Sequence, residues 1–350
     1  MVRSKTIIAV PPGATIKEQL EVRGMSQKEF AARMEMSEKH ISHLINGDVQ
    51  LTPDVAMRLE FVLGSPAHFW NNLESIYREK LVKIKAENEM DEDAETVKKL
   101  PYNEMAKNGW VEHTRNRAER VNNTRKFFEV VRLGNLDGAF MPKIVARKLG
   151  AGEKSDYALI AWAQRAKIEA RSIPTRPVNI DRVKTLIETF REMTVQDPSV
   201  FCPKLCNHLA DCGIALVFLP HIGGSFLHGA TFLDGSKIVI GMTVRGRDAD
   251  RFWFSFFHEL GHVVLGHLSQ HEGTNEDDEH AADEFARNTL IPDSEFYEFV
   301  KQQLFDKQSI IAFARRIGID VGSVVGRLQK EGFLDFSEYH DLKTKYILTA

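Results

Sequence analysis

The chain has 350 residues, of which 43% are hydrophobic and 27% charged. This composition excludes a disordered or collagen-like protein and suits a globular one with about two to three domains. The formal net charge of −3 gives no overall indication of nucleic-acid binding. Neither an apolar run of about 18 residues nor a signal peptide is present, so we expect no membrane partner. The three cysteines lie in one short stretch and cannot form a disulfide framework, which favours a cytoplasmic location.

Residues 1–81 are predicted to form a bundle of short helices that contains a helix-turn-helix. A Ser-x-x-Glu capping box at Ser26 opens one helix. A second helix begins at Ser37 and ends at Asn46, with Gly47 as its C-cap. Small and apolar residues between these signals suit a motif whose second helix enters the major groove of DNA. Glu35 departs from the pattern, because a turn residue such as Gly is common at its position.

Polar residues on the outward face of these two helices are the candidates for DNA contacts. They are Gln27, Ser37, Glu38, Lys39, His40, His43 and Asn46. Lys39 and His43 lie four residues apart on one face and are the best candidates for base edges, whereas Gln27 and Asn46 suit hydrogen bonds to phosphate. The alternative is a bundle with a solvated polar face, because residues 1–80 hold ten basic and ten acidic side chains.

Residues 82–177 are predicted to be a basic helical connector. A charged segment from Glu79 to Lys99, closed by Pro101, separates it from the first domain, and the RSIPTRPVNI stretch separates it from the last. Residues 115–184 hold sixteen Lys or Arg and seven Asp or Glu. They either contact nucleic acid or an acidic protein, or form a solvated face.

Residues 178–350 are predicted to form a third domain, which combines helices with a small sheet. Helices are expected over residues 181–193 and 202–212. Three apolar runs, GIALVFLP, HGATFLDG and SKIVIGM, then read as strands. A long apolar helix begins near Asp250, and shorter helices follow. The fold class is therefore mainly α with a small β-sheet (α+β).

The long apolar helix carries the sequence His-Glu-x-x-His, formed by His258, Glu259 and His262. Two histidines four residues apart lie about 40° apart around a helix and can share one metal ion. Neutral imidazoles suit Zn²⁺, and a catalytic zinc site needs a third protein ligand and an open position. The alternative is a chance motif made of buried core histidines.

The third ligand is predicted on the next helix. His267 lies about 140° around the first helix from His262 and is expected to face elsewhere. Glu279, seventeen residues after His262, can complete the ligand set. Asp283, one turn further on the same face, can accept the outer N–H of a ligand histidine.

Two weaker features are also present. Cys202, Cys206, His208 and Cys212 could form a second metal cluster, although cysteines on a helix are more often small buried apolar residues. His228 and His280 are the candidates for stabilising an oxyanion.

Both ends of the chain resemble known families. The stretch from ATIKEQLEVRGMSQKEF to FWNNLESIY is similar to the Xre/Cro-type domain of HigA-type antitoxins, which implies a lambda-repressor-like bundle that binds operator DNA as a homodimer. HGATFLDGSKIVIGM, DRFWFSFFHELGHVVLGH and EHAADEFARNTLIP resemble the ImmA/IrrE metallopeptidases, which are zincin-like. Members of this family often show Glu-x-Glu-Ala-Asp. This chain has Ala281 in place of the second Glu, so the resemblance leaves Glu279 as the candidate acid of this pair.

The second resemblance implies one Zn²⁺ per chain, held by His258, His262 and Glu279, with Glu259 as the catalytic base and Asp283 behind a ligand. Together the two resemblances imply a transcriptional regulator with a zinc-dependent endopeptidase domain. Its implied substrate is a regulatory protein, such as a repressor or a toxin partner. The alternative is a non-enzymatic, HigA-like antitoxin whose zinc fold binds a partner or senses a signal.

Overall fold

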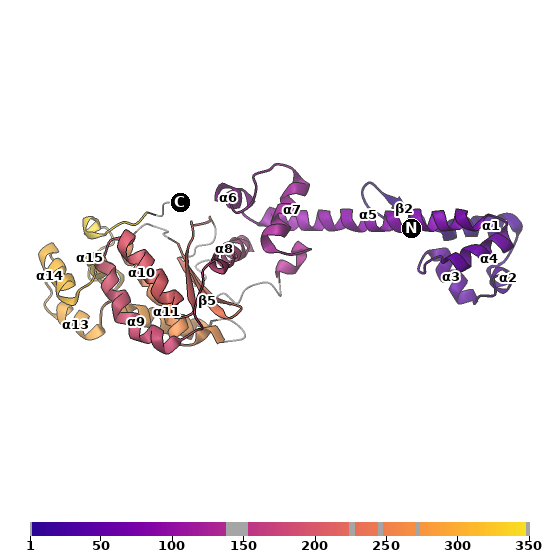
Figure 1. The fold of residues 1–350 in the computed structure, drawn as a ribbon. Coiled ribbons are helices and arrows are strands. Elements are labelled where there is room, and N and C mark those ends of the chain that lie inside the picture. The colour runs from indigo at the N-terminus through magenta and orange to yellow at the C-terminus, as the bar shows by residue number, and fades with distance from the viewer. Residues whose placement is uncertain (1, 138–152, 224–227, 244–247, 270–273, 348–350) are drawn as a thin grey trace. The chain divides into compact units, whose positions relative to one another are not determined.

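The computed structural model describes residues 2–137, 153–223, 228–243, 248–269 and 274–347 (Figure 1). Two compact units divide the chain, an N-terminal unit (Met1–Glu95) and a C-terminal unit (Thr96–Ala350). Lys143, Arg147 and Lys148, which contribute to the basic stretch, lie outside the described residues. None of the described helices combines the length and the apolar character needed to cross a membrane.

Four helices and most of a fifth form the larger part of the N-terminal unit. They are α1 (Pro12–Arg23), α2 (Gln27–Arg33), α3 (Glu38–Asn46), α4 (Pro53–Leu63) and α5 (Ala67–Lys99). The predicted start signals are confirmed, because the Ser26 and Ser37 side chains accept hydrogen bonds from the third residue after each. Gly47 ends α3 in the left-handed conformation, at φ 79°.

The turn between α2 and α3 is closed by a residue in an unusual conformation. Glu35 has a φ of 54°, which is the left-handed region that glycine adopts without strain. The helices around this turn pack through Phe30, Met34, Ile41 and Leu44, all of which are buried. The helix-turn-helix therefore keeps its core although its turn position holds Glu.

Two features of the N-terminal unit differ from the sequence-based expectation. The charged segment after Glu79 does not interrupt the helix, because α5 runs without a break to Lys99. The strands β1 (Val2–Arg3) and β2 (Ile8–Ala9) form a hairpin whose apolar residues cluster with Tyr77 and Ile84 of α5. Strands of two residues are too short to show a period of two, so the sequence pattern did not predict them.

The C-terminal unit is mainly helical. Its α-helices are α6 (Tyr102–Lys107), α7 (Arg117–Phe128), α8 (Glu153–Arg171), α9 (Ile180–Glu192), α10 (Pro198–Ala210), α11 (Ala249–Val264), α12 (Glu276–Leu290), α13 (Asp293–Lys301), α14 (Lys307–Ile317) and α15 (Val321–Lys330). Short 3-10 helices are η1 (Leu133–Asp137), η2 (Met193–Val195), η3 (His267–Ser269) and η4 (His340–Leu342). The predicted helices near 181–193, 202–212 and 250 are confirmed as α9, α10 and α11.

The three predicted strands form one mixed sheet. In the order β3-β5-β4, the central strand β5 (Lys237–Met242) is parallel to β3 (Ile214–Phe218) and antiparallel to β4 (Gly229–Asp234). Gly235, at φ 60°, makes the tight turn between β4 and β5. The fold class predicted from the sequence, helices with a small sheet, is confirmed.

The sheet separates two helical layers and positions α11. Ile238, Ile240 and Met242 alternate along β5 and join the apolar core that contains α11. Gly241 faces the other way, where a Cβ atom would lie 2.5 Å from the Trp162 ring of α8. The metal-motif helix is thus buried against the sheet through the same core.

Candidate metal centre

Helix α11 brings the two motif histidines together in the interior of the C-terminal unit. The Nε2 atoms of His258 and His262 lie 3.0 Å apart, and both side chains are buried. Most of the helix is buried, with Trp253, Phe256 and Phe257 among its buried residues, so close packing holds the two histidines in place.

Helix α12 supplies the acid that faces these histidines. It begins at a capping box formed by Asn275 and Asp278, which places Glu279 in its first turn. The Glu279 carboxylate lies 3.4 Å from His258 Nε2 and 3.6 Å from His262 Nε2. Close approach of the two helices depends on Gly261, where a Cβ atom would lie 3.0 Å from the Phe285 ring.

The group formed by His258, His262 and Glu279 fits a tetrahedral zinc ion. Ligand atoms about 2.0–2.1 Å from a tetrahedral Zn²⁺ lie about 3.4 Å from one another, close to the observed spacings of 3.0, 3.4 and 3.6 Å. Glu279 Oε2 is buried without a hydrogen-bond partner among the described residues. A cation between these atoms would satisfy it, and these three are the group with metal-ligand geometry in the described part of the chain.

The outer nitrogen of His258 has the partner that the sequence predicted. His258 Nδ1 lies 2.8 Å from Asp283 Oδ1, one turn beyond Glu279 on α12. A donated Nδ1–H leaves the Nε2 lone pair directed at the other ligand atoms, which is the tautomer that metal binding needs.

The outer partner of His262 is His267, and the expectation that His267 faces elsewhere is wrong. His262 Nδ1 lies 2.9 Å from His267 Nδ1, and His267 Nε2 lies 3.6 Å from Asp278. The expectation assumed that the helix continues, but α11 ends at Val264 and Gly266, at φ 82°, reverses the chain. His267 is not one of the three residues with metal-ligand geometry, so it contacts a candidate ligand without being a candidate itself.

Glu259 is buried beside the three residues with metal-ligand geometry. Burial raises the pKa of this carboxyl to about 7, although the positive charge of His258 and a hydrogen bond from Thr231 lower it. Thr231 Oγ1 donates to Glu259 Oε2 at 2.6 Å. A carboxyl group with a pKa near neutrality is suited to taking and releasing a proton.

Two residues that support Glu259 were missed by the sequence analysis. Thr231 and Gly229 both come from β4, and a Cβ atom at Gly229 would lie 2.7 Å from Glu259 Cγ. Gly229 therefore has to be glycine because Glu259 occupies the space that any larger side chain would fill. The Gly-x-Thr pattern at the start of the predicted strand was the only signal in the sequence.

The protein environment also sets the charge of the three candidate ligands. Burial lowers the pKa of His258, but contacts with Asp283 and Glu279 outweigh it and raise the pKa to about 9. Burial together with the charge of His258 lowers the pKa of His262 to about 4. Burial opposes ionisation of Glu279, yet His258 and a hydrogen bond from Thr274 lower its pKa. Zinc would therefore have to displace a proton from His258.

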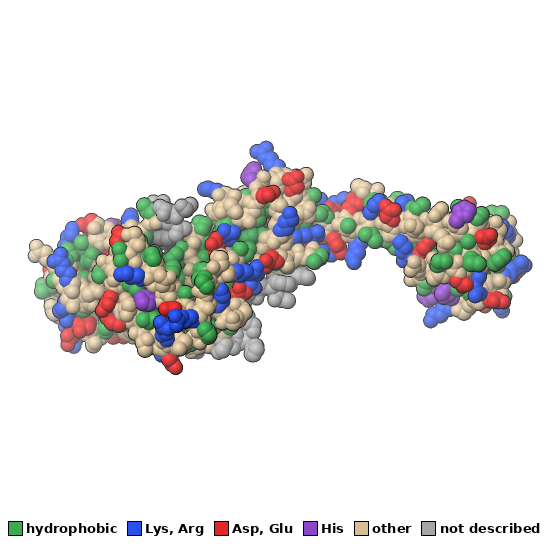
Figure 2. All heavy atoms as spheres, in the orientation of Figure 1, with side chains coloured by type: hydrophobic (Ala, Val, Ile, Leu, Met, Phe, Trp, Pro, Cys, Tyr) green, Lys and Arg blue, Asp and Glu red, His purple; other side chains and the backbone are tan. Residues whose placement is uncertain are grey.

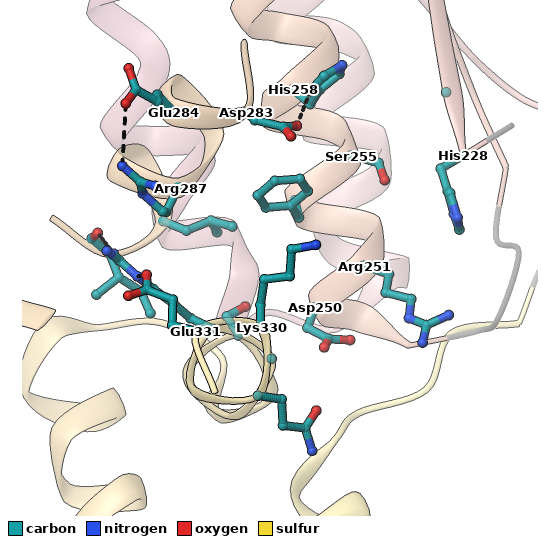
Figure 3. A pocket seen from close by; sticks show the side chains of 18 of the residues that line it. His228, Asp250, Arg251, Ser255, His258, Asp283, Glu284, Arg287, Lys330 and Glu331 are labelled. Atoms are coloured by element: carbon teal, nitrogen blue, oxygen red, sulfur yellow. Dashed lines mark hydrogen bonds and ion pairs between the residues drawn. The ribbon is translucent and has the colours of Figure 1, made fainter. Parts of the chain in front are cut away.

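A pocket of about 660 Å³ opens onto His258 and Glu259 between α11, α12 and α15 (Figure 3). His228 and His280, the two oxyanion candidates, both line it. The volume lies in the range of small-ligand and peptide side-chain sites. The buried Glu259 is thus reached from this cleft.

The DNA-contact candidates lie together on the surface of the N-terminal unit. Gln27, Ser37, Glu38, Lys39 and Asn46 are exposed, and His40 and His43 are half-buried. Figure 2 shows histidine and basic side chains gathered on the edge of this unit over α3. His43 Nδ1 lies 3.1 Å from Asp48, so this candidate already has an acidic partner.

The cysteines belong to the apolar core of the C-terminal unit. Cys212 is fully buried and Cys202 and Cys206 pack against the same core. Burial raises the pKa of Cys206 to about 11. Because metal binding needs a thiolate, these features favour the packing interpretation over a second metal cluster.

Two separate segments of the chain match known protein families. Residues 16–70 match the family model described as helix-turn-helix, and residues 238–329 match the IrrE N-terminal-like domain, a peptidase family. The uncharacterized HTH-type transcriptional regulator YddM of Escherichia coli is 38% identical over 66 residues, which cover 19% of this chain and 70% of that protein. An addiction module antidote protein of the HigA family from Coxiella burnetii is 25% identical, with a TM-score of 0.23, over 25% of this chain and 95% of that chain.

Both family resemblances predicted from the sequence are confirmed. The protein therefore belongs to the helix-turn-helix DNA-binding regulators and carries, toward its C-terminus, an IrrE N-terminal-like domain of a peptidase family.

Proposed function

We propose that the protein is a zinc-dependent endopeptidase that cleaves a regulatory protein and that also binds operator DNA as a homodimer. The observation that carries the enzymatic part is the placement of Glu259, which is buried, lines a pocket of substrate size and lies beside His258, His262 and Glu279, the group with metal-ligand geometry. A zinc site that only stabilised a fold would not require a base at this position. We place its action in the cytoplasm, where DNA is accessible and thiols stay reduced.

The residues of the chain divide the chemistry between them. Zn²⁺, held by His258, His262 and Glu279, would supply a Lewis acid that polarises a carbonyl and acidifies water. Glu259 would hold Oε2 against Thr231 and use Oε1 to take the proton of the attacking water. The same carboxyl would then deliver this proton to the leaving nitrogen. Its raised pKa, about 7, suits both halves of the transfer.

The supporting residues would fix the orientation of the ligand rings. Asp283 accepts from His258, and His267 lies against the outer nitrogen of His262. We propose that both are positioning residues, because each sets the tautomer that leaves Nε2 free for the metal.

The division of the chain into three domains, with boundaries at residues 81 and 177, also stays a proposal.

The DNA-binding part rests on the exposed face of α3. Ser37, Glu38, Lys39, His40 and His43 would face the major groove. Gln27 and Asn46, at the ends of α2 and α3, would bond to phosphates and fix the register.

Glu259→Gln tests the enzymatic proposal. The full-length, zinc-loaded protein is incubated with a mixture of bacterial proteome-derived peptides, and new termini are identified by mass spectrometry. We expect cleavage by the wild type and a loss of at least about 100-fold in the variant, because a positioned general base contributes about that much. Zinc content and DNA binding should be unchanged. Equal cleavage by both proteins would exclude Glu259 as the base.

Zinc content tests the site without relying on activity. We expect about one zinc per wild-type chain and none in His262→Ala. If the wild type takes up no zinc after reconstitution, the enzymatic proposal fails. The protein would then act as a non-enzymatic repressor or antitoxin that binds a partner through this fold.

A further inference from the structure

Four of the acidic side chains that line the pocket contact a basic side chain or a histidine of the protein. The contacts join Asp250 to Lys343 at 2.8 Å, Asp283 to His258 at 2.8 Å, Glu284 to Arg287 at 3.7 Å and Glu331 to Arg327 at 2.9 Å. Arg327 is also held by Asp293 and by the Ile291 carbonyl. The Glu284 contact is the longest of these, and this side chain is 51% exposed, whereas the other three acids are held by short contacts and Glu259 is buried.

Lys330 is different from the other cations of the pocket. It is the last residue of α15, it is exposed, and it forms no ion pair with any described residue. Figure 3 shows its side chain extending from α15 into the pocket, in the direction of Asp283 and His258. Its ammonium group therefore points into the cleft that leads to Glu259.

Arg251 adds a second weakly engaged cation. Its side chain is 57% exposed and its nearest acidic atom, on Asp248, is 3.7 Å away. It lines the same pocket from the first turn of α11. Arg251 and Glu284 are therefore held to a similar degree, and Lys330 is the cation of the described lining that forms no ion pair with a described residue.

We propose that Lys330 makes this pocket selective for peptides with an acidic side chain beside the bond to be cleaved. This inference rests on the proposed function and adds the substrate class. An ammonium group in a cleft is less screened than one on a convex surface, since protein walls exclude part of the water. The Lys330 ammonium would pair with an Asp or Glu carboxylate of the substrate, with Arg251 supporting the same charge.

The expected effect is moderate because Lys330 remains in contact with water. An ion pair at a partly exposed site changes affinity by about two- to fivefold, and reversal of the charge by about tenfold. The effect should appear in KM or in binding, and not in the proton transfer at Glu259, because the lysine contacts the substrate away from the reacting atoms.

The test compares Lys330→Glu with the wild type on the same proteome-derived peptide mixture. Lys301→Glu is the matched control, because Lys301 is also the exposed last residue of a helix, α13, but does not line the pocket. We expect wild type and Lys301→Glu to cleave next to Asp or Glu at least about threefold more often than next to Gln or Asn. Lys330→Glu should lose this preference while retaining one zinc per chain.

A binding measurement separates this inference from the proposed function. The mixture is passed over immobilised zinc-loaded Glu259→Gln protein, with and without Lys330→Glu, and retained peptides are identified. Retention of acidic peptides that requires Lys330 supports the inference even if no cleavage is found. Cleavage or retention with the same residue preference in the presence and absence of Lys330 overturns it and leaves the proposed function intact. Absence of both cleavage and retention overturns both.

Discussion

The helix-turn-helix and the candidate metal site differ in how far apart along the chain their side chains lie. All the DNA-contact candidates lie between Gln27 and Asn46, on two adjacent helices, and none of them is buried. The candidate metal site joins α11 to α12, and the neighbouring Glu259 contacts Gly229 and Thr231 of β4. A surface that is built locally should tolerate substitutions one at a time, whereas a buried site built from distant segments should fail when one neighbour changes volume.

The largest effect is expected from Gly229→Ala. The added Cβ would lie 2.7 Å from Glu259 Cγ and 2.9 Å from its Oε1, so the carboxyl group has to move. A misplacement of about 1 Å in a catalytic group costs about 100-fold in rate. We expect kcat/KM for peptide cleavage to fall by about that factor, with zinc content unchanged.

Gly134→Ala is the control for this change. No atom lies within 4 Å of a Cβ built at Gly134, so this substitution should leave cleavage at the wild-type rate. If Gly229→Ala cleaves peptides as fast as Gly134→Ala, the inference that β4 positions Glu259 is wrong.

The cysteines offer a second test of what tertiary structure decides. Burial raises the pKa of Cys206 from 9.0 to about 11, so at neutral pH the thiolate fraction is about 100-fold below that of an ordinary cysteine. Alkylation by iodoacetamide should be slower by about this factor in the folded protein than in the chain unfolded in guanidinium, and should accelerate as the pH rises toward 11. Equal rates in the two states, measured by mass spectrometry, would mean that Cys206 is accessible.

A smaller effect is expected from Lys39→Ala in the helix-turn-helix. Loss of one lysine contact should weaken binding about tenfold to a duplex selected by the wild type from random DNA, and should reduce the salt dependence. Lys17→Ala, which removes an exposed lysine from α1, should bind as the wild type does. Neither change should alter zinc content. Equal DNA affinities of Lys39→Ala and Lys17→Ala would show that Lys39 does not contact the DNA.

The smallest effect is expected from Glu35→Gly. Glu35 holds a φ of 54°, a conformation that costs a non-glycine residue about 1 kcal/mol, and its 3.7 Å contact with Arg58 is too exposed to offset much of this. We expect about 0.5 kcal/mol of stabilisation, seen as slower hydrogen exchange in α2 and α3. Ala32→Gly, in an exposed position of α2, should have the opposite effect of about 1 kcal/mol. Faster exchange in Glu35→Gly would show that the turn is not strained.

Local signals were sufficient for most of the secondary structure. Capping residues such as Ser26 and Ser37 act over three residues, so their effect is visible in the sequence itself. The alternation of apolar residues along β5 was equally readable. The hairpin at the N-terminus was not, because its strands are stabilised by Tyr77 and Ile84, which lie far along the chain.

The sequence predicted the two motif histidines of the candidate site better than the residues around them. The spacing of His258 and His262 on one helix predicts that they can share an ion, because the helix repeat alone brings them together. The same reasoning failed for His267, since Gly266 turns the chain back and brings that ring onto His262. Periodicity describes a helix only as far as the helix extends.

The sequence by itself determined the helix-turn-helix, the strand set and the residues able to bind zinc, because capping, periodicity and residue chemistry are local properties. Tertiary structure alone decided that β4 supports Glu259, that burial raises its pKa to about 7, and that Lys330 enters the pocket without an ion pair among the described residues. These properties depend on which distant segments pack together and on how much water they exclude, and no local pattern contains that information.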